Sequence, residues 1–190
     1  SIRRQRQMCI RDRPEESRSG IVYAGNLGIN RITPLVSLGR ALKEAAIAGF
    51  ETIHVYSGER NPAILQQLKE ENGLTYCGRI PAQEVERVLG ASKFIIFTEA
   101  FDRSSICRTK YSLSTKIAES LRSGACILAY GPDEIASIDY LKQHHSACIL
   151  REAGELPGTV QRLCAAPEEY RAYTPVSYTH LRAHETVLDL

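Results

Sequence analysis

Tryptophan is absent from the 190-residue sequence, and methionine occurs once. The sequence also lacks a large excess of either charge: 24 Lys and Arg residues nearly balance 22 Asp and Glu residues, which gives a formal net charge of +2. A balance this close argues against a nucleic-acid-binding surface, so we expect no nucleic-acid partner. No apolar run approaches the ~20 residues that span a bilayer, and none follows the N-terminal arginines as in a signal peptide. Membrane spanning and secretion are therefore not expected.

The six cysteines include no C-x-x-C pair, so the usual sequence signs of a zinc site or a redox motif are lacking. Cys126 and Cys148 lie within apolar stretches, where a thiol behaves as a small buried hydrophobic group. We therefore expect reduced, mostly buried thiols in a cytoplasmic protein. His144 and His145 are adjacent, so on a helix their side chains would diverge by ~100° and form a poor metal-binding pair.

The two ends of the chain differ from its middle. Residues 1–16 carry five arginines and show no helical or strand periodicity. These residues and residues 175–190 resemble translated sequencing-adapter read-through, so we expect non-native or disordered tails and a gene truncated on both sides. The alternative for the first segment is a cationic arm that binds nucleic acid. Residues 17–174 remain as one domain, long enough for a sizeable core.

This middle region alternates short apolar runs with helical patterns. The expected strands are 21–24, 52–56, 74–77, 94–97, 126–129 and 147–150. The expected helices are 33–49, 61–68, 84–89, 115–122, 132–142 and a stretch around 155–172 that prolines interrupt. The first of these helices would begin at Thr33 as N-cap with Pro34 as its first residue, and a long loop would follow the fourth strand.

Strands that alternate with helices in this way predict right-handed crossovers and a parallel sheet. The expected fold class is α/β, a doubly wound parallel Rossmann-like sheet with helices on both faces. Ligands of such sheets bind beyond the carboxyl ends of the strands, near the point where the strand order reverses. The loops that follow the strands are therefore the first places to look for function.

The loop after the first strand has the chemistry of an anion site. Gly25 and Gly28 permit a ligand to approach the backbone closely, and Arg31 places a cation just before a helix. This loop suits a diphosphate. It is not a G-x-G-x-x-G fingerprint, and Ser57-Gly58 follow the second strand where a ribose-binding Asp or Glu would stand. The alternative is a glycine turn with a surface arginine.

A second candidate lies at the start of the helix expected over 115–122. Ser114 and Thr115 place hydroxyls there, and Lys116 lies in the first turn, where a cation opposes the helix dipole unless an anion is bound. Glu119 follows on the same face and could accept hydrogen bonds from two ribose hydroxyls. The alternative is an ordinary capped surface helix with a solvated lysine and glutamate.

Three segments together resemble the donor-binding C-terminal domain of a retaining GT-B glycosyltransferase (group 1, family 4-like). They are YAGNLGINR at 23–31, LTYCGRIPAQEVERVLGASKFIIF at 74–97 and YSLSTKIAESLRSGACILAYGP at 111–132, which contains an S/T-K-x-x-E helix. The resemblance implies a nucleotide-sugar donor as partner, UDP- or GDP-linked, with Glu119 at the ribose. The loop of Gly78, Arg79 and Ile80 would face the nucleobase, largely through backbone atoms. The residues implied at the donor diphosphate are Gly25, Gly28, Arg31, Ser114, Thr115 and Lys116.

The resemblance also implies what this chain lacks. GT-B enzymes carry the acceptor site and usually a catalytic side chain in an N-terminal half, so we expect a truncated hexosyltransferase that is inactive alone, and no catalytic residue is assigned. No metal and no cofactor are expected, because cationic side chains and a helix terminus would stabilise the departing diphosphate. We expect a cytoplasmic location, with the inner face of the cell membrane as an alternative reached only through the missing half. The acceptor would be a glycan, a lipid or a small molecule.

Two positions depart from the family pattern. Tyr111 stands eight residues before Glu119, where many relatives have a first glutamate, and Asn26 stands where many have an arginine. Other classes stay open: a non-catalytic nucleotide-binding module, a GT-B-shaped sugar-nucleotide epimerase, and a flavodoxin-like interaction domain that binds no nucleotide.

Overall fold

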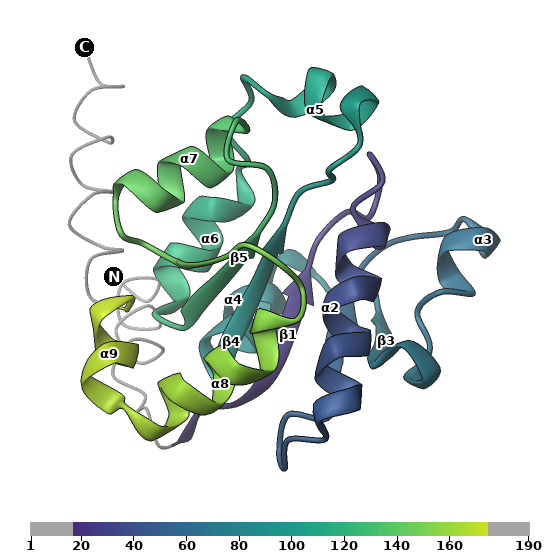
Figure 1. Ribbon diagram of the computed structural model, residues 1–190. Coiled ribbons are helices and arrows are strands. Elements are labelled where there is room, and N and C mark those ends of the chain that lie inside the picture. Colours follow the sequence, from purple (N-terminus) through teal and green to yellow (C-terminus); the bar gives the residue numbers. More distant parts are fainter. Residues whose placement is uncertain (1–16, 175–190) are drawn as a thin grey trace.

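The computed structural model describes residues 17–174 (Figure 1), so the predictions for both tails lie outside the described residues. The chain forms one sheet of six strands, all parallel, in the order β3-β2-β1-β4-β5-β6. Their bounds are β1 Ser19–Ala24, β2 Ile53–Tyr56, β3 Leu74–Gly78, β4 Ser92–Thr98, β5 Cys126–Tyr130 and β6 Cys148–Leu150. The expected fold class is confirmed. The strand order reverses between β1 and β4, and it differs from the flavodoxin order, so the chain does not have a flavodoxin fold.

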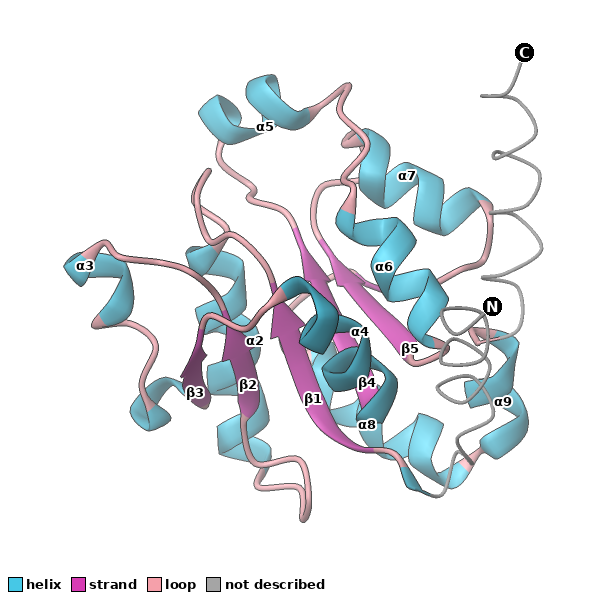
Figure 2. Ribbon diagram, turned by 180° about the vertical axis from the view of Figure 1, so that it is seen from behind, coloured by secondary structure: helices cyan, strands magenta, loops and turns pink. Residues whose placement is uncertain are grey.

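Helices cover both faces of this sheet. Their bounds are α2 Ile32–Ala45, α3 Pro62–Leu65, α4 Ala82–Ala91, α5 Arg103–Thr109, α6 Lys116–Ser123, α7 Ala136–Gln143, α8 Glu155–Ala165 and α9 Pro167–Ala172, with a 3₁₀-helix, η2, at Glu70–Asn72. Figure 1 shows α2 and α8 side by side on one face, and Figure 2 shows α4 and α6 together on the other.

Alternating side chains of the central strands divide the core in two. Ile21 and Phe94 pack with residues of α2 and α8 on one face, whereas Val22 and Ile95 pack with Leu89 of α4 on the other. A second cluster on the α6 side joins that helix to α7 and β5. Because both faces of each strand are buried, β4 and β5 read as continuous apolar runs in the sequence.

Several element boundaries differ from the sequence prediction. Helix α2 begins at Ile32 with Arg31 as N-cap, and the Thr33 hydroxyl donates to Asn30 Oδ1 at 2.8 Å instead of capping the helix. The reason is that Ile29 and Asn30 take left-handed φ values of 58° and 53°, which turn the chain into the helix early. Pro34 then falls at the third helical position, whose amide has no partner within the helix in any case.

Three other helical predictions also need correction. The helix expected over 61–68 ends at Leu65. The loop expected after β4 contains α5, whose N-terminus is capped because Asp102 accepts from the Ser105 amide at 3.0 Å. Pro157 does not interrupt α8, because it lies in the first turn of that helix, where a missing amide hydrogen leaves no intrahelical bond unmade. Pro167 opens α9.

The five described cysteines are free thiols, and they are less uniformly buried than expected. Cys126 and Cys148 are buried, and burial raises the pKa of both thiols. Cys77 and Cys164 are half-buried, and Cys107 in α5 is exposed. Within residues 17–174, none of the helices has the length and apolar character needed to cross a membrane.

The contact of α2 with the turn before β3 allows a first test. A Cβ on Gly39 would overlap the backbone oxygen of Asn72 and lie 2.7 Å from Leu74 Cδ2, whereas a Cβ on Gly158 in α8 would meet nothing within 4 Å. Gly39→Ala should lower the free energy of unfolding by about 1–3 kcal/mol through overpacking. The same change at Gly158 should raise it by about 0.5–1 kcal/mol through helix propensity. Urea unfolding measures both, and equal effects at the two sites would contradict this packing.

Candidate functional site

A pocket of about 170 Å³ opens where β1, β2 and β3 end and α6 begins. It contains five of the residues predicted from the sequence. The lining residues are Ala24, Gly25, Tyr56, Ser57, Gly58, Arg79, Ile80, Val85, Lys116 and Glu119. This is the carboxyl edge of the sheet, beside the reversal of strand order, where doubly wound folds bind ligands.

Backbone hydrogen bonds continue beyond the strand ends and hold the pocket wall together. The Gly25 amide donates to Tyr56 O at 2.9 Å, and the Ser57 amide donates to Gly78 O at 3.0 Å. A Cβ at position 25 would overlap Lys116 Nζ, so a larger residue there would displace the lysine side chain. The loop after β1 and the start of α6 are therefore in close contact, as the two candidate motifs suggested.

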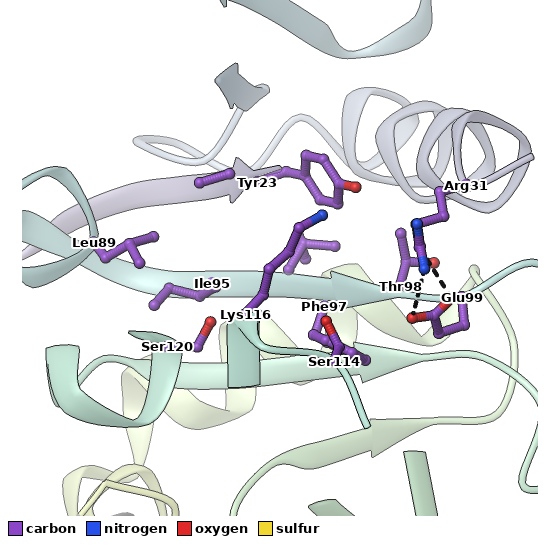
Figure 3. Close-up of a pocket in the computed structure, with 12 residues that line it drawn as sticks. Tyr23, Arg31, Leu89, Ile95, Phe97, Thr98, Glu99, Ser114, Lys116 and Ser120 are labelled. Atoms are coloured by element: carbon purple, nitrogen blue, oxygen red, sulfur yellow. Dashed lines mark hydrogen bonds and ion pairs between the residues drawn. The ribbon is translucent and has the colours of Figure 1, made fainter. Parts of the chain in front are cut away.

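Lys116 is the half-buried cation of this pocket and the first residue of α6. Its ammonium lies 5.6 Å from the centroid of the Tyr23 ring (Figure 3). It also lies 3.4 Å from Asn26 O. Burial, followed by the nearby charge of Arg31, lowers the pKa of Lys116 to about 8, although Glu99 and Glu119 act in the opposite direction. An anion in the pocket would favour the charged lysine and raise this pKa again.

Arg31 does not stand free in the pocket as the sequence suggested. Its Nε and Nη2 donate to the two carboxylate oxygens of Glu99 at 3.0 and 3.2 Å (Figure 3). Its Nη1 donates to Gly28 O at 3.4 Å. Glu99 is only 2% exposed and directly follows β4. With Ser114 and Lys116, these two residues line a small neighbouring cavity of about 10 Å³. A guanidinium carries five N–H bonds, so two remain unused by the described residues.

Glu99 is the functional neighbour that the sequence interpretation missed. The sequence left Glu99 in a loop after the fourth strand, either overhanging the sugar or solvated. Its amide instead donates to Tyr130 O at 3.1 Å and so extends the pairing of β4 with β5. The available signal was its position directly after a buried apolar run. Asp102, three residues on, accepts from Asn30 Nδ2 at 2.9 Å, and hydrogen bonds from Asn30 and Ser105 lower the pKa of Asp102 to about 2.

The predicted hydroxyls at the start of α6 do not cap it. Thr115 is the N-cap residue but makes no side-chain cap hydrogen bond. The Ser114 amide donates instead to the Ser137 hydroxyl of α7 at 2.9 Å, and that hydroxyl donates to Ser112 O at 3.1 Å. Segment 110–114 is thereby fixed to α7.

Four other residues of the prediction lie outside the larger pocket. Gly28, Gly78 and Thr115 line neither cavity, and Ser114 lines only the smaller one. Tyr111, in the position of the family's first glutamate, is 89% exposed and also lines neither cavity. The structure therefore brings together Gly25, Arg79, Ile80, Lys116 and Glu119 around the larger pocket. Arg31 lines the smaller cavity, which Lys116 also lines.

Comparison with known proteins shows the fold. No family model matches the sequence, and no curated protein matches it. The chain is similar to WaaG, a glycosyltransferase involved in lipopolysaccharide biosynthesis (TM-score 0.60, 10% identity), over 94% of this chain and 45% of that one. It is similar to the C-terminal domain of the group 1 glycosyl transferase LpcC from Francisella tularensis (TM-score 0.61, 13% identity), over 95% of this chain and 91% of that domain. The chain has the fold of a GT-B half.

The share of each similar structure that this chain covers differs between whole enzymes and a separate domain. The chain covers 42% of an α,α-trehalose-phosphate synthase (UDP-forming) from Burkholderia vietnamiensis, with a TM-score of 0.64, 10% identity and 89% of this chain matched. It thus spans less than half the length of this synthase and of WaaG, but nearly all of the separate LpcC domain. The C-terminal GT-B fold that the sequence resemblance implied is confirmed.

The buried ion pair provides a test of the site's framework. Glu99→Leu leaves the Arg31 guanidinium without its carboxylate, so the free energy of unfolding should fall by about 3 kcal/mol. Arg31→Met combined with Glu99→Leu should recover most of that loss, because no unpaired charge remains. Denaturant unfolding of both proteins measures the difference, with Glu152→Leu as an exposed control. A double variant as unstable as the single one would contradict the pairing.

The lowered pKa of Lys116 predicts a pH dependence of stability. The unfolded chain keeps this proton up to its ordinary pKa of 10.5, whereas the folded chain releases it near 8. The unfolded state therefore binds more protons in this window, and the stability of the wild type should rise with pH relative to Lys116→Met, by about 3 kcal/mol across the window.

This difference is measured as the free energy of unfolding at pH 7 and pH 10. Lys69→Met removes an exposed lysine and should show no such divergence from the wild type. A constant difference between wild type and Lys116→Met across the window would show that Lys116 titrates normally.

Proposed function

We propose that residues 17–174 bind the nucleotide-sugar donor of a glycosyltransferase, and that the acceptor site and the catalytic side chain belong to another half of the enzyme. One observation carries the proposal: the pocket at the carboxyl edge gathers Gly25, Lys116 and Glu119 with the loop after β3. Because these residues come from three separate regions of the sequence, a chance surface would not be expected to collect them. The GT-B fold supports the same assignment.

The diphosphate would lie against Lys116 at the start of α6. A bound anion stabilises the charged form of Lys116, which burial disfavours, and the helix N-terminus adds a favourable dipole. Arg31, oriented by Glu99, keeps two N–H bonds that can point toward the same anion. In the transfer step, these cations would stabilise the negative charge on the departing nucleoside diphosphate. We infer that no metal ion is needed for this charge, so affinity should be the same in the presence of a chelator.

The ribose would lie against Glu119. This side chain is exposed, lines the pocket and stands one turn along α6 from Lys116. A carboxylate can accept a hydrogen bond from each of two neighbouring hydroxyls, as the 2′ and 3′ positions of a ribose present. The nucleobase would then extend toward the loop after β3.

Calorimetric titration of the full chain with UDP, GDP and UDP-glucose tests this function. Glu119→Ala and Lys116→Met should each weaken nucleotide binding by about 1.5–3 kcal/mol, roughly ten- to a hundredfold, because each removes a hydrogen bond to or from a charged group. Glu44→Ala and Lys69→Met alter exposed residues outside the pocket and should bind as the wild type does.

Two outcomes would contradict the proposal. One is the failure of a folded chain to bind any of the three nucleotides. The other is binding that is indifferent to both Glu119 and Lys116, which would place the nucleotide elsewhere. A sugar nucleotide that binds more weakly than its parent diphosphate would favour the non-catalytic module over a transferase.

A further inference from the structure

The pocket wall formed by the ends of β2 and β3 carries the guanidinium of Arg79, which makes no hydrogen bond or ion pair with the described residues. Arg79 follows β3, and its exposed side chain lies along Gly58, since a Cβ built on Gly58 would stand 3.4 Å from Arg79 Cδ and 4.0 Å from its Nε. Among residues 17–174, no hydrogen bond or ion pair occupies this guanidinium. Arg31, by contrast, is held by a carboxylate. The donors of Arg79 are therefore available to a ligand.

Ser57 provides a second unused polar group on the same wall. It is 4% exposed, and its hydroxyl is the one buried side-chain polar atom of the described residues that has no hydrogen-bond partner. Its backbone is occupied on both sides, because its amide donates to Gly78 O and its carbonyl accepts from the Tyr76 hydroxyl at 3.0 Å. A buried hydroxyl without a partner is unfavourable, so an incoming polar group would be stabilised there.

The order of residues along the sheet edge indicates which part of a nucleotide reaches this wall. Lys116 lies at the end of β1 in contact with Gly25, and Glu119 lies one turn further along α6. Ser57 and Arg79 follow at the ends of β2 and β3, and β2 pairs with both β1 and β3. A nucleoside diphosphate with its phosphates at Lys116 and its ribose at Glu119 therefore extends its base toward Ser57 and Arg79.

The two side chains distinguish between bases. Guanine presents O6 and N7 as neighbouring acceptors, which match the two-pronged donor geometry of an arginine. Uracil has no neighbouring pair of acceptors, because its O4 lies between the N3–H donor and a carbon. Ile80 and Val85 line the same pocket and offer an apolar surface to the face of a base. A guanidinium that no residue of the fold occupies thus fits guanine better than uracil.

We propose that this pocket selects a guanine nucleotide, with Arg79 donating to O6 and N7 of the base and the Ser57 hydroxyl making a further hydrogen bond to it. The inference rests on the proposed function and narrows its donor to a GDP-sugar. It also gives the Arg79 side chain a role that the sequence resemblance assigned to backbone atoms.

The test compares GDP, UDP and 7-deaza-GDP, which lacks the N7 acceptor, by calorimetry with the full chain. GDP should bind at least tenfold more tightly than UDP, with 7-deaza-GDP between them. Arg79→Lys keeps the charge but removes the two-pronged geometry, so it should abolish the preference for GDP by weakening GDP binding at least tenfold more than UDP binding. Arg60→Lys alters another exposed arginine and should keep the preference.

Ser57→Ala separates binding from a purely structural role. Because the hydroxyl has no partner in the free protein, its removal should leave the thermal midpoint unchanged or raised, while GDP binds severalfold more weakly. A lower midpoint with unchanged GDP affinity would overturn the role of Ser57.

The outcomes for the base are equally distinct. Binding of UDP as tight as that of GDP, or a GDP preference that survives Arg79→Lys, would overturn the inference and leave the proposed function standing. Failure of both diphosphates to bind the folded chain would overturn the two together.

Discussion

The buried pair of Arg31 and Glu99 joins the loop after β1 to the end of β4, across the point where the strand order reverses. β1 pairs with β4 up to Val22 and Ile95, and the ion pair links the segments that follow these two strands. Both oxygens of the carboxylate bind the guanidinium, which fixes the direction of Arg31 and places its charge beside Lys116. The position of Arg31 therefore depends on this carboxylate, and the charge of Arg31 in turn lowers the pKa of Lys116.

Lys116 shows how this arrangement bears on function. A half-buried ammonium near a guanidinium is unfavourable in the empty protein, and its lowered pKa is the measure of that cost. Glycine at position 25 removes the side chain that would otherwise occupy the space of the ammonium. An anionic ligand placed here would reduce the repulsion between the charges of Lys116 and Arg31. Such preorganised charge is the usual means of stabilising a departing anion.

The sequence was sufficient for the sheet and insufficient for parts of the site, for physical reasons. Strand and helix periodicities depend on neighbouring residues, so the sequence is enough to predict them. Continuous apolar runs such as those of β4 and β5 predict strands that are buried on both faces. The contacts of Glu99 and the burial of Ser57 were not predicted, because they depend on which strand ends lie side by side. The start of α2 was misplaced, because Ile29 and Asn30 adopt left-handed conformations that bulky side chains rarely take. Helix α5 was missed because seven residues with a polar composition show no helical period.

The fold is shared with GT-B glycosyltransferases at 10–13% identity, and a shared fold does not by itself fix the function. The most direct measurement of the central claim is a crystal structure of the full chain with GDP. The account predicts phosphate oxygens within hydrogen-bond distance of Lys116 Nζ, ribose hydroxyls on Glu119, and the base between Ser57 and Arg79. A nucleotide bound at another edge of the sheet, or in this pocket without contact to Lys116 and Glu119, would contradict it.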